Sequence, residues 1–122
     1  MATMFTTTLR VKEFDAALDF YSRVLGLPVI ARYPGAQGQQ IAMLGEDGHA
    51  HLELIEETAV PVGATPGFYL CLELDGADPA AELERVASEA GEVAGPVRLR
   101  EGLAMYVLHD PQGYEVHLLD RS

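Results

Sequence analysis

Positive charge is scarce in this chain of 122 residues. Eight lysines and arginines stand against 19 aspartates and glutamates, and the formal net charge is −11. Nucleic acids and anionic membrane surfaces are bound by clustered basic side chains, so we expect neither as a partner. A strongly acidic protein attracts cationic ligands over long range, although the same charge also keeps it soluble.

Cysteine and long apolar segments are scarce as well. Cys71 is the single cysteine of the sequence, which excludes an intrachain disulfide and any metal site built from several thiolates. No apolar run approaches the ~20 residues of a transmembrane helix, and no signal segment of basic and apolar residues is visible at the N-terminus. We therefore expect a cytoplasmic protein.

The order of strands and helices repeats once along the chain. Residues 4–57 and 66–121 each contain one helical pattern among short segments that are typical of strands. Apolar residues within 13–26 recur at steps of four, three and four, which is one face of a helix. In the second half, Asp78 and Pro79 are typical of a helix start.

The two halves align at offsets of 63 to 65 residues, which pairs Leu9 with Leu72 and Gly26 with Gly91. An internal repeat of this kind indicates two copies of one structural unit. The sequence thus predicts an α+β fold, a single domain over residues 1–122 built of two tandem βαβββ modules. Their curved mixed sheet would carry the helices outside and a cleft inside.

Polar side chains gather on the predicted cleft side of the strands. Because side chains alternate between faces along a strand, the apolar residues that pack under a helix define which neighbours face the other way. This alternation, with Tyr106 added as a second aromatic surface, indicates the candidate ligand-binding residues Thr6, Thr8, Arg10, His51, Glu53, Tyr69, Glu73, Tyr106 and His117. The pattern fits a binding cavity with convergent polar groups, and it also fits a solvated sheet face.

Glu53 and His117 are the candidate acid–base residues in this set. A carboxylate in a semi-enclosed cleft needs a partner to stay ionised, and Glu53 could pair with His117 or with Arg10, while Glu73 could also pair with Arg10. A lone histidine is more often a hydrogen-bonded cavity residue than a metal ligand. Cys71 lies on the same predicted face and is a candidate nucleophile, although isolated cysteines mostly behave as small buried apolar residues.

Two stretches of the sequence are similar to a known group of proteins. The segments LRVKEFDAALDFYSRVLGLPV (9–29) and HDPQGYEVHLLD (109–120) resemble the first-module signature and the closing hairpin of the vicinal oxygen chelate superfamily. That superfamily contains glyoxalase I, bleomycin-resistance proteins, fosfomycin-resistance enzymes and extradiol dioxygenases. Together with the strand order, the resemblance covers essentially the whole chain. It implies a cup-shaped sheet of paired βαβββ modules, often completed in a homodimer.

The resemblance also implies a metal site in the metal-dependent members, with one ligand from each of up to four strands. Carried onto this sequence, those positions fall on Thr6, Glu53, Tyr69 and His117. Glyoxalase I-like members have His or Gln, Glu, His and Glu there, so this chain departs from the pattern at most positions. Glu53 and His117 supply two ligands, and His51, outside the family positions, is a candidate third. A catalytic Zn, Ni, Mn or Fe ion usually needs three protein ligands.

The sequence leaves three functions open. The one we expect is a metal-independent small-molecule binding protein of the bleomycin-resistance type, which sequesters a cationic or aromatic antibiotic or metabolite in the cleft of a homodimer. The alternative is a metal-dependent lyase or dioxygenase that uses Glu53 and His117. The third is a metal-free isomerase or lyase with either residue as its base. Whether the protein is an enzyme stays open, because one scaffold serves all three.

Overall fold

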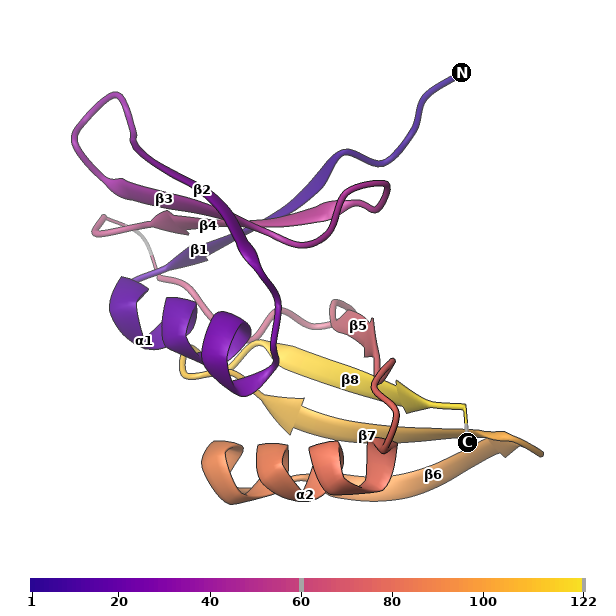
Figure 1. The fold of residues 1–122 in the computed structure, drawn as a ribbon. Helices are drawn as coiled ribbons and strands as arrows, with labels where there is room; N and C mark the ends of the chain where they lie inside the picture. Colours follow the sequence, from indigo (N-terminus) through magenta and orange to yellow (C-terminus); the bar gives the residue numbers. More distant parts are fainter. Residues whose placement is uncertain (60, 122) are drawn as a thin grey trace. The chain divides into compact units, whose positions relative to one another are not determined.

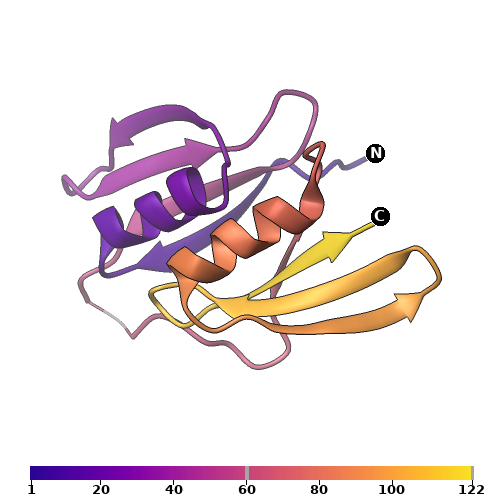
Figure 2. The ribbon, with the colours of Figure 1, turned by 60° about the horizontal axis from the view of Figure 1, so that its bottom comes forward.

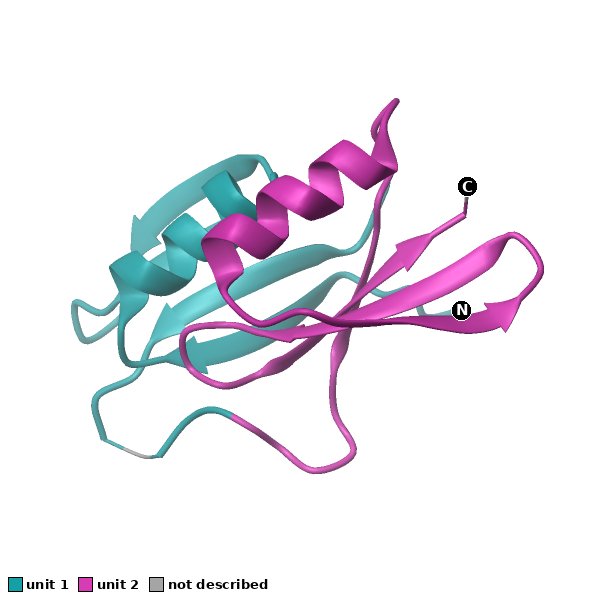
Figure 3. Ribbon diagram, turned by 90° about the horizontal axis from the view of Figure 1, so that it is seen from below, with its two compact units in different colours: residues 1–63 teal, residues 64–122 magenta. Residues whose placement is uncertain are grey.

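The computed structural model describes residues 1–59 and 61–121, and the chain divides into two compact units. Unit 1 comprises residues 1–63 and unit 2 comprises residues 64–122 (Figure 3). In each unit, a strand and a helix are followed by three further strands (Figure 1). Each unit holds its own four-stranded sheet. The predicted repeat of two βαβββ modules is therefore confirmed.

Unit 1 combines a mixed sheet with one helical segment. Its elements are β1 (Thr6–Val11), α1 (Phe14–Asp19), the π-helical turn η1 (Phe20–Val24), β2 (Val29–Pro34), β3 (Gln40–Leu44) and β4 (His51–Glu56). The strand order is β1-β4-β3-β2, with β1 parallel to β4 and the other neighbours antiparallel. Parallel strands cannot be joined by a tight turn, so the helix, β2 and β3 all lie in the connection between β1 and β4.

Alternation along β1 and β4 places the core of unit 1 on one face of its sheet. Leu9 and Val11 of β1 and Leu52 and Leu54 of β4 are buried, together with Phe14 of α1. Burying a leucine or phenylalanine side chain stabilises a fold by ~1.5–3 kcal/mol. This apolar face therefore holds the helix, and the residues between these positions are turned to the opposite face.

The segment predicted as a helix over 13–26 is helical, but its second half is a π-turn. The amide of Leu25 bonds to the carbonyl of Phe20 at 2.9 Å, five residues back instead of four. Phe20 and Tyr21 are both buried, and their rings meet edge to face with centroids 5.1 Å apart. A regular α-helix separates adjacent side chains by ~100° around its axis, so the wider turn is what lets both neighbours enter the core.

Unit 2 repeats the arrangement with a longer helix. Its elements are β5 (Leu70–Glu73), α2 (Pro79–Ala90), β6 (Ala94–Arg100), β7 (Leu103–His109) and β8 (Glu115–Asp120). The strand order is β5-β8-β7-β6, with β5 parallel to β8 and the other neighbours antiparallel. Figure 2 shows β6, β7 and β8 side by side in orange to yellow. The buried apolar residues of α2 and the sheet are Val86, Ala104, Leu108, Val116 and Leu118.

The ends of α2 follow from its sequence. The Asp78 side chain accepts the amide of Ala81 at 3.1 Å, and Pro79 occupies the first helical position. Gly91 ends the helix at a φ of 85°, a left-handed conformation that favours glycine. Among the described residues, neither helix has the length and the apolar content needed to cross a membrane.

The turn between β7 and β8 sets the register of the strands that carry the site. Oδ1 of the buried Asp110 accepts the amides of Gln112 at 2.8 Å and of Tyr114 at 2.9 Å. An aspartate that bonds the backbone of its own turn holds that turn in one geometry. The resulting register pairs His109 with Glu115.

The alternation of apolar residues over 67–75 predicts a strand with Phe68 on its helix-packed face, but β5 is shorter than this segment. It begins at Leu70, and the segment before it turns, with the amide of Phe68 bonded to the carbonyl of Thr65 at 3.1 Å. Proline and glycine at 66 and 67 favour a turn over a strand. Phe68 therefore lies outside the sheet and not on its helix-packed face, which corrects the prediction.

Candidate functional site

Glu53 of β4 lies on the face of the unit 1 sheet opposite the buried leucines, and both of its carboxylate oxygens accept hydrogen bonds. Thr8, its register partner on β1, donates from Oγ1 to Oε1 at 2.7 Å. Tyr33 of β2 donates from its hydroxyl to Oε2 at 3.1 Å. This hydrogen bond raises the pKa of Tyr33 above its ordinary value, with smaller contributions from burial and from the charge of Glu53. Two hydroxyl groups thus hold the carboxylate in place.

Arg10 and Glu73 pair with residues other than those predicted. Arg10 forms an ion pair with Glu57 at 2.8 Å, and Glu73 forms one with Arg121. Within unit 1, Glu53 is bonded to Thr8 and Tyr33, so the possible pair of Arg10 with Glu53 does not form among the described residues. The reason is the pairing of the strands: the amide of Glu57 bonds to β1 just beyond Arg10. Exposed ion pairs of this kind typically contribute ~0–1 kcal/mol.

His51 opens β4 and lies beside the turn that precedes it, with Thr6 as its register partner on β1. Its Nε2 is 3.2 Å from the carbonyl oxygen of Glu46, and its ring centroid is 6.3 Å from that of Phe5. This nitrogen contacts the turn, whereas the carboxylate of Glu53 is bonded elsewhere. Within the described part of the chain, the two share no common partner.

His117 of β8 is a buried histidine held by two neighbours, with 8% of its surface exposed. Its Nε2 lies 2.6 Å from Oε2 of Glu115. The ring of Tyr69 stacks on it, with centroids 3.8 Å apart and planes 12° apart. The contact with a carboxylate indicates that Nε2 carries the proton, which leaves Nδ1 as an acceptor in the neutral ring. Nδ1 is buried without a hydrogen-bond partner among the described residues, a condition that costs ~1–3 kcal/mol.

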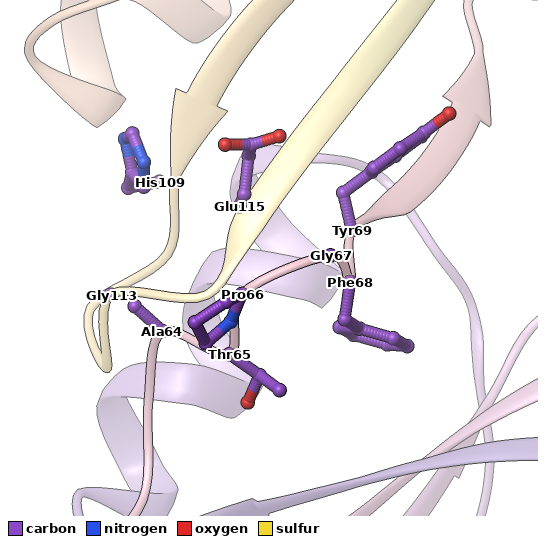
Figure 4. Close-up of a pocket in the computed structure, with 9 residues that line it drawn as sticks. All are labelled: Ala64, Thr65, Pro66, Gly67, Phe68, Tyr69, His109, Gly113 and Glu115. Atoms are coloured by element: carbon purple, nitrogen blue, oxygen red, sulfur yellow. The ribbon is translucent and has the colours of Figure 1, made fainter.

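A pocket of about 330 Å³ lies beside this cluster in unit 2. The residues that line it are Ala64, Thr65, Pro66, Gly67, Phe68, Tyr69, His109, Gly113 and Glu115 (Figure 4). Tyr69 and Glu115 therefore contact His117 and also form part of the pocket wall. A concave site with a few convergent polar groups and aromatic walls is the usual form of a small-molecule site.

Tyr106 lies on the other face of the unit 2 sheet. It pairs with Leu118 across β7 and β8, whereas His117 pairs with Val107. Directly opposed cross-strand residues share a face, so Tyr106 lies on the same side as the buried Leu118. It does not join Tyr69 on the polar face, and this part of the prediction is wrong because the register of the hairpin decides it.

Cys71 is exposed and pairs in register with His117. Partial burial of the thiol, and then the charge of Glu73, raise the pKa of Cys71 above its ordinary value. The thiolate is the nucleophilic form, so a raised pKa lowers the reactive fraction at neutral pH. These surroundings oppose a nucleophilic role, and they also differ from the buried apolar environment expected of a lone cysteine.

The repeated βαβββ unit and the closing hairpin are shared with a described protein family. A sequence model of the glyoxalase/bleomycin resistance protein/dioxygenase superfamily matches residues 3–118. The chain belongs to this superfamily. The resemblance inferred from two short motifs is therefore confirmed over both units.

Relatives of this superfamily member carry different names. Curated lactoylglutathione lyases of Neisseria meningitidis serogroup A and Shigella flexneri are each 29% identical over 126 residues, covering 95% of this chain and 88% and 90% of theirs. An antibiotic binding protein of a Streptomyces species is 23% identical with a TM-score of 0.73, covering 100% of this chain and 98% of that one. The trypanothione-dependent glyoxalase I of Leishmania major is 22% identical with a TM-score of 0.75, covering 99% and 88%. The two structures share the fold.

Members of the superfamily often use divalent metals, but the donors at the corresponding positions of this chain do not fit a metal site. Those positions, as the resemblance implies them, hold Thr6, Glu53, Tyr69 and His117. Hydroxyls occupy both oxygens of Glu53, Nε2 of His117 is bonded to Glu115, and Tyr69 contributes its ring face. Within each unit, as far as the structure describes it, no three His, Cys, Asp or Glu side chains are grouped so as to hold a metal ion. A catalytic site usually needs three such ligands.

Glu115, His109 and Tyr33 are among the residues at these sites that the list of candidate residues left out. The position of Glu115 two residues before His117 is a usable signal, because that spacing puts both on one strand face. His109 and Tyr33 carry no local signal. Only the pairing of strands brings the first beside Glu115 and the second beside Glu53.

Proposed function

We propose that the chain binds a small organic molecule without a divalent metal, in the manner of a bleomycin-resistance protein that sequesters an antibiotic or a metabolite. The stacking of Tyr69 on His117, with Glu115 bonded to the imidazole, carries this proposal. By resemblance, Tyr69 and His117 stand at positions where metal-dependent members have ligands. In this chain the same positions offer an aromatic surface and a histidine whose Nε2 is already occupied.

Tyr69 is suited to packing against a ligand and poorly suited to coordination. Divalent metals in such sites prefer imidazole and carboxylate ligands, and a neutral phenol offers neither. One face of the Tyr69 ring rests on His117, and 50% of the residue is exposed. An aromatic side chain fixed on one side and open on the other buries a large area of a ligand at little cost in conformational entropy.

The similarity to an antibiotic binding protein supports this function as far as a shared fold can, since one scaffold carries several activities. We further propose that the protein acts in the cytoplasm as a homodimer whose two copies both contribute to the ligand cleft. A pocket of about 330 Å³ holds a small molecule or part of a larger one. Dimerisation would enlarge the apolar surface available to a larger ligand.

Metal analysis and calorimetry test the proposal together. Protein purified without chelator is expected to contain far less than one equivalent of Zn, Ni, Mn or Fe per chain. Titration with a panel of cationic and aromatic antibiotics is expected to find saturable binding that EDTA leaves unchanged. One bound metal per chain, binding that EDTA abolishes and metal restores, or no binding across the panel would each overturn the proposal.

A metal-dependent lyase is the second candidate, favoured by the 29% identity to lactoylglutathione lyases over 95% of the chain. It predicts that, after addition of Zn, Ni, Mn or Fe, the chain interconverts lactoylglutathione with glutathione and the 2-oxoaldehyde that cleavage releases, assayed from both sides through the thioester absorbance. We expect no turnover above background. Metal-dependent turnover that Glu53→Gln abolishes would replace the proposed binding function with this one. Metal-free turnover that His117→Gln abolishes would assign a base catalyst instead.

A further inference from the structure

Three side chains form a row across the polar face of the unit 2 sheet. Strands β7 and β8 pair His109 with Glu115. Strand β5 runs parallel to β8 with Leu70 opposite Val116, so Tyr69, the residue before Leu70, comes level with Glu115. Figure 4 shows Glu115 in the middle, with His109 on one side and Tyr69 on the other. All three line the pocket of about 330 Å³.

Glu115 brings an anionic group to this pocket in a fixed position. Its Oε2 lies 2.6 Å from Nε2 of His117, which is itself buried. Its Oε1 has no partner within residues 1–59 and 61–121, and the side chain is 42% exposed. A carboxylate held through one oxygen and open at the other is preorganised to accept a charge-assisted hydrogen bond or a positive charge.

Aromatic and apolar surface surrounds this carboxylate. Tyr69 rests on His117 with one ring face and is half exposed. Phe68 and Pro66 line the same pocket from the turn before β5, and the described lining residues include no lysine or arginine. The face of an aromatic ring attracts a cation within ~6 Å of its centroid. The wall thus combines one negative group with surfaces that favour a flat or cationic partner.

We propose that this pocket binds an organic cation with a flat apolar body, its positive group at Glu115 and its ring against Tyr69. This inference specifies the ligand class and the binding subsite, and its physiological meaning rests on the proposed function. An anion would meet the carboxylate with no lysine or arginine in the described pocket wall to offset it. The net charge of −11 draws cations towards the protein over long range.

The probe is benzyltrimethylammonium, which combines one aromatic ring with a permanent positive charge. Titrated into the isotope-labelled full chain and followed by amide NMR, it is expected to give saturable shifts within segments 64–69 and 109–117. Benzyl alcohol keeps the ring and lacks the charge, and tetramethylammonium keeps the charge and lacks the ring. Each is expected to bind at least about tenfold more weakly, because each loses one of the two contacts.

Variants assign the binding to the named side chains. Glu115→Gln removes the charge at nearly constant size, and Tyr69→Leu removes the ring. Each is expected to raise the dissociation constant of benzyltrimethylammonium about tenfold. Glu92→Gln makes the same charge change at an exposed position of unit 2 outside the pocket and is expected to leave binding unchanged. The amide spectrum reports whether each variant is folded. If Glu115→Gln does not fold, the affinity of Tyr69→Leu for benzyltrimethylammonium tests the assignment.

Three results would overturn this assignment: equal binding of benzyl alcohol, shifts confined to other segments, or undiminished affinity in the folded variants. The outcome is separable from that of the proposed function. If antibiotics bind while benzyltrimethylammonium does not, the cation subsite is wrong and the proposed function stands. If benzyltrimethylammonium binds while a stoichiometric metal is found, the subsite stands and the metal-free function is wrong.

Discussion

Glu53 and His117 are both immobilised on a sheet face, but by different means. The carboxylate of Glu53 divides its oxygens between Thr8 and Tyr33, which reach it from two other strands. The imidazole of His117 is held by Glu115 two residues away and by the Tyr69 ring. A single hydrogen bond contributes ~0.5–1.5 kcal/mol in net terms. The two contacts on each group therefore fix its orientation more than they stabilise the fold.

The shifted pKa of Tyr33 gives a prediction at this scale. Glu53→Gln removes the charge that accepts the Tyr33 hydrogen bond, so the pKa of Tyr33 should fall towards its ordinary value. Ultraviolet titration of phenolate in the parent and the variant measures this, and Tyr33→Phe identifies the Tyr33 signal among the five tyrosines. A pKa raised in the folded state stabilises the fold below the unfolded pKa of ~10. That contribution is lost as the pH rises through the folded pKa.

Thr8→Val is the matched control for this titration. It removes the hydrogen bond to the other oxygen of Glu53 but leaves the carboxylate and its contact with Tyr33. The raised pKa of Tyr33 should therefore persist in Thr8→Val. Identical phenolate titrations in the parent and in Glu53→Gln would show that Glu53 is not the cause.

At the scale of elements, helix ends and turns decide where the polar faces lie. The predicted start of α2 at Pro79 is confirmed, because Asp78 and Pro79 specify it locally. The predicted helix of unit 1 differs from the structure, because a π-turn accommodates two adjacent aromatic residues in the core. The residues that cap a helix can be recognised in the sequence. A change of helical period depends on the packing of the helix against the core, which the local sequence does not show.

The cap of α2 provides a stability prediction. Asp78→Ala removes the acceptor of the Ala81 amide, and losing an N-cap costs ~0.5–2 kcal/mol. Urea unfolding should show this loss, while Asp78→Asn, which keeps an acceptor oxygen, should lose less. Asp75→Ala changes an exposed aspartate just before the helix and should stay within ~0.5 kcal/mol of the parent. A loss in Asp75→Ala as large as in Asp78→Ala would mean that charge near the helix start matters, and not the cap.

At the scale of the whole molecule, each sheet has an exposed edge strand. Every residue of β2 and of β6 is exposed, and β6 carries the half-exposed Val97 and Leu99. Exposed edge strands with apolar side chains are prone to pairing with another chain. The net charge of −11 opposes such association at low ionic strength, so salt should strengthen it.

The proposed homodimer is testable by sedimentation. We expect a species of twice the chain mass of 13.2 kDa, with a dissociation constant that falls as salt screens the repulsion between acidic chains. Analytical ultracentrifugation at low and at physiological ionic strength measures both. A species of 13.2 kDa at every concentration and ionic strength would contradict the dimer.

Many features of the fold were predictable because they rest on neighbours in the sequence. The strand–helix–strand order follows from hydrophobic period, and the start of α2 follows from Asp78 and Pro79. The candidate site was predictable only in part. Alternation puts Glu115 and His117 on one face, yet it does not reveal that Tyr69 stacks on the imidazole. Tyr106 lies on the face opposite His117, because the register of the β7–β8 hairpin, and not the chemistry of the residue, determines its side of the sheet.

The amino-acid sequence by itself determined the repeated module, the acidic charge, the polar faces of single strands and the family. The tertiary structure alone decided the partners: Thr8 meets Glu53 across 45 residues, and Arg121 meets Glu73 across 48. It also decided that His109, Glu115 and Tyr69 share one pocket. The physical reason is that period and capping act within one or two turns of the chain, whereas strand pairing joins segments whose separation leaves no trace in local pattern.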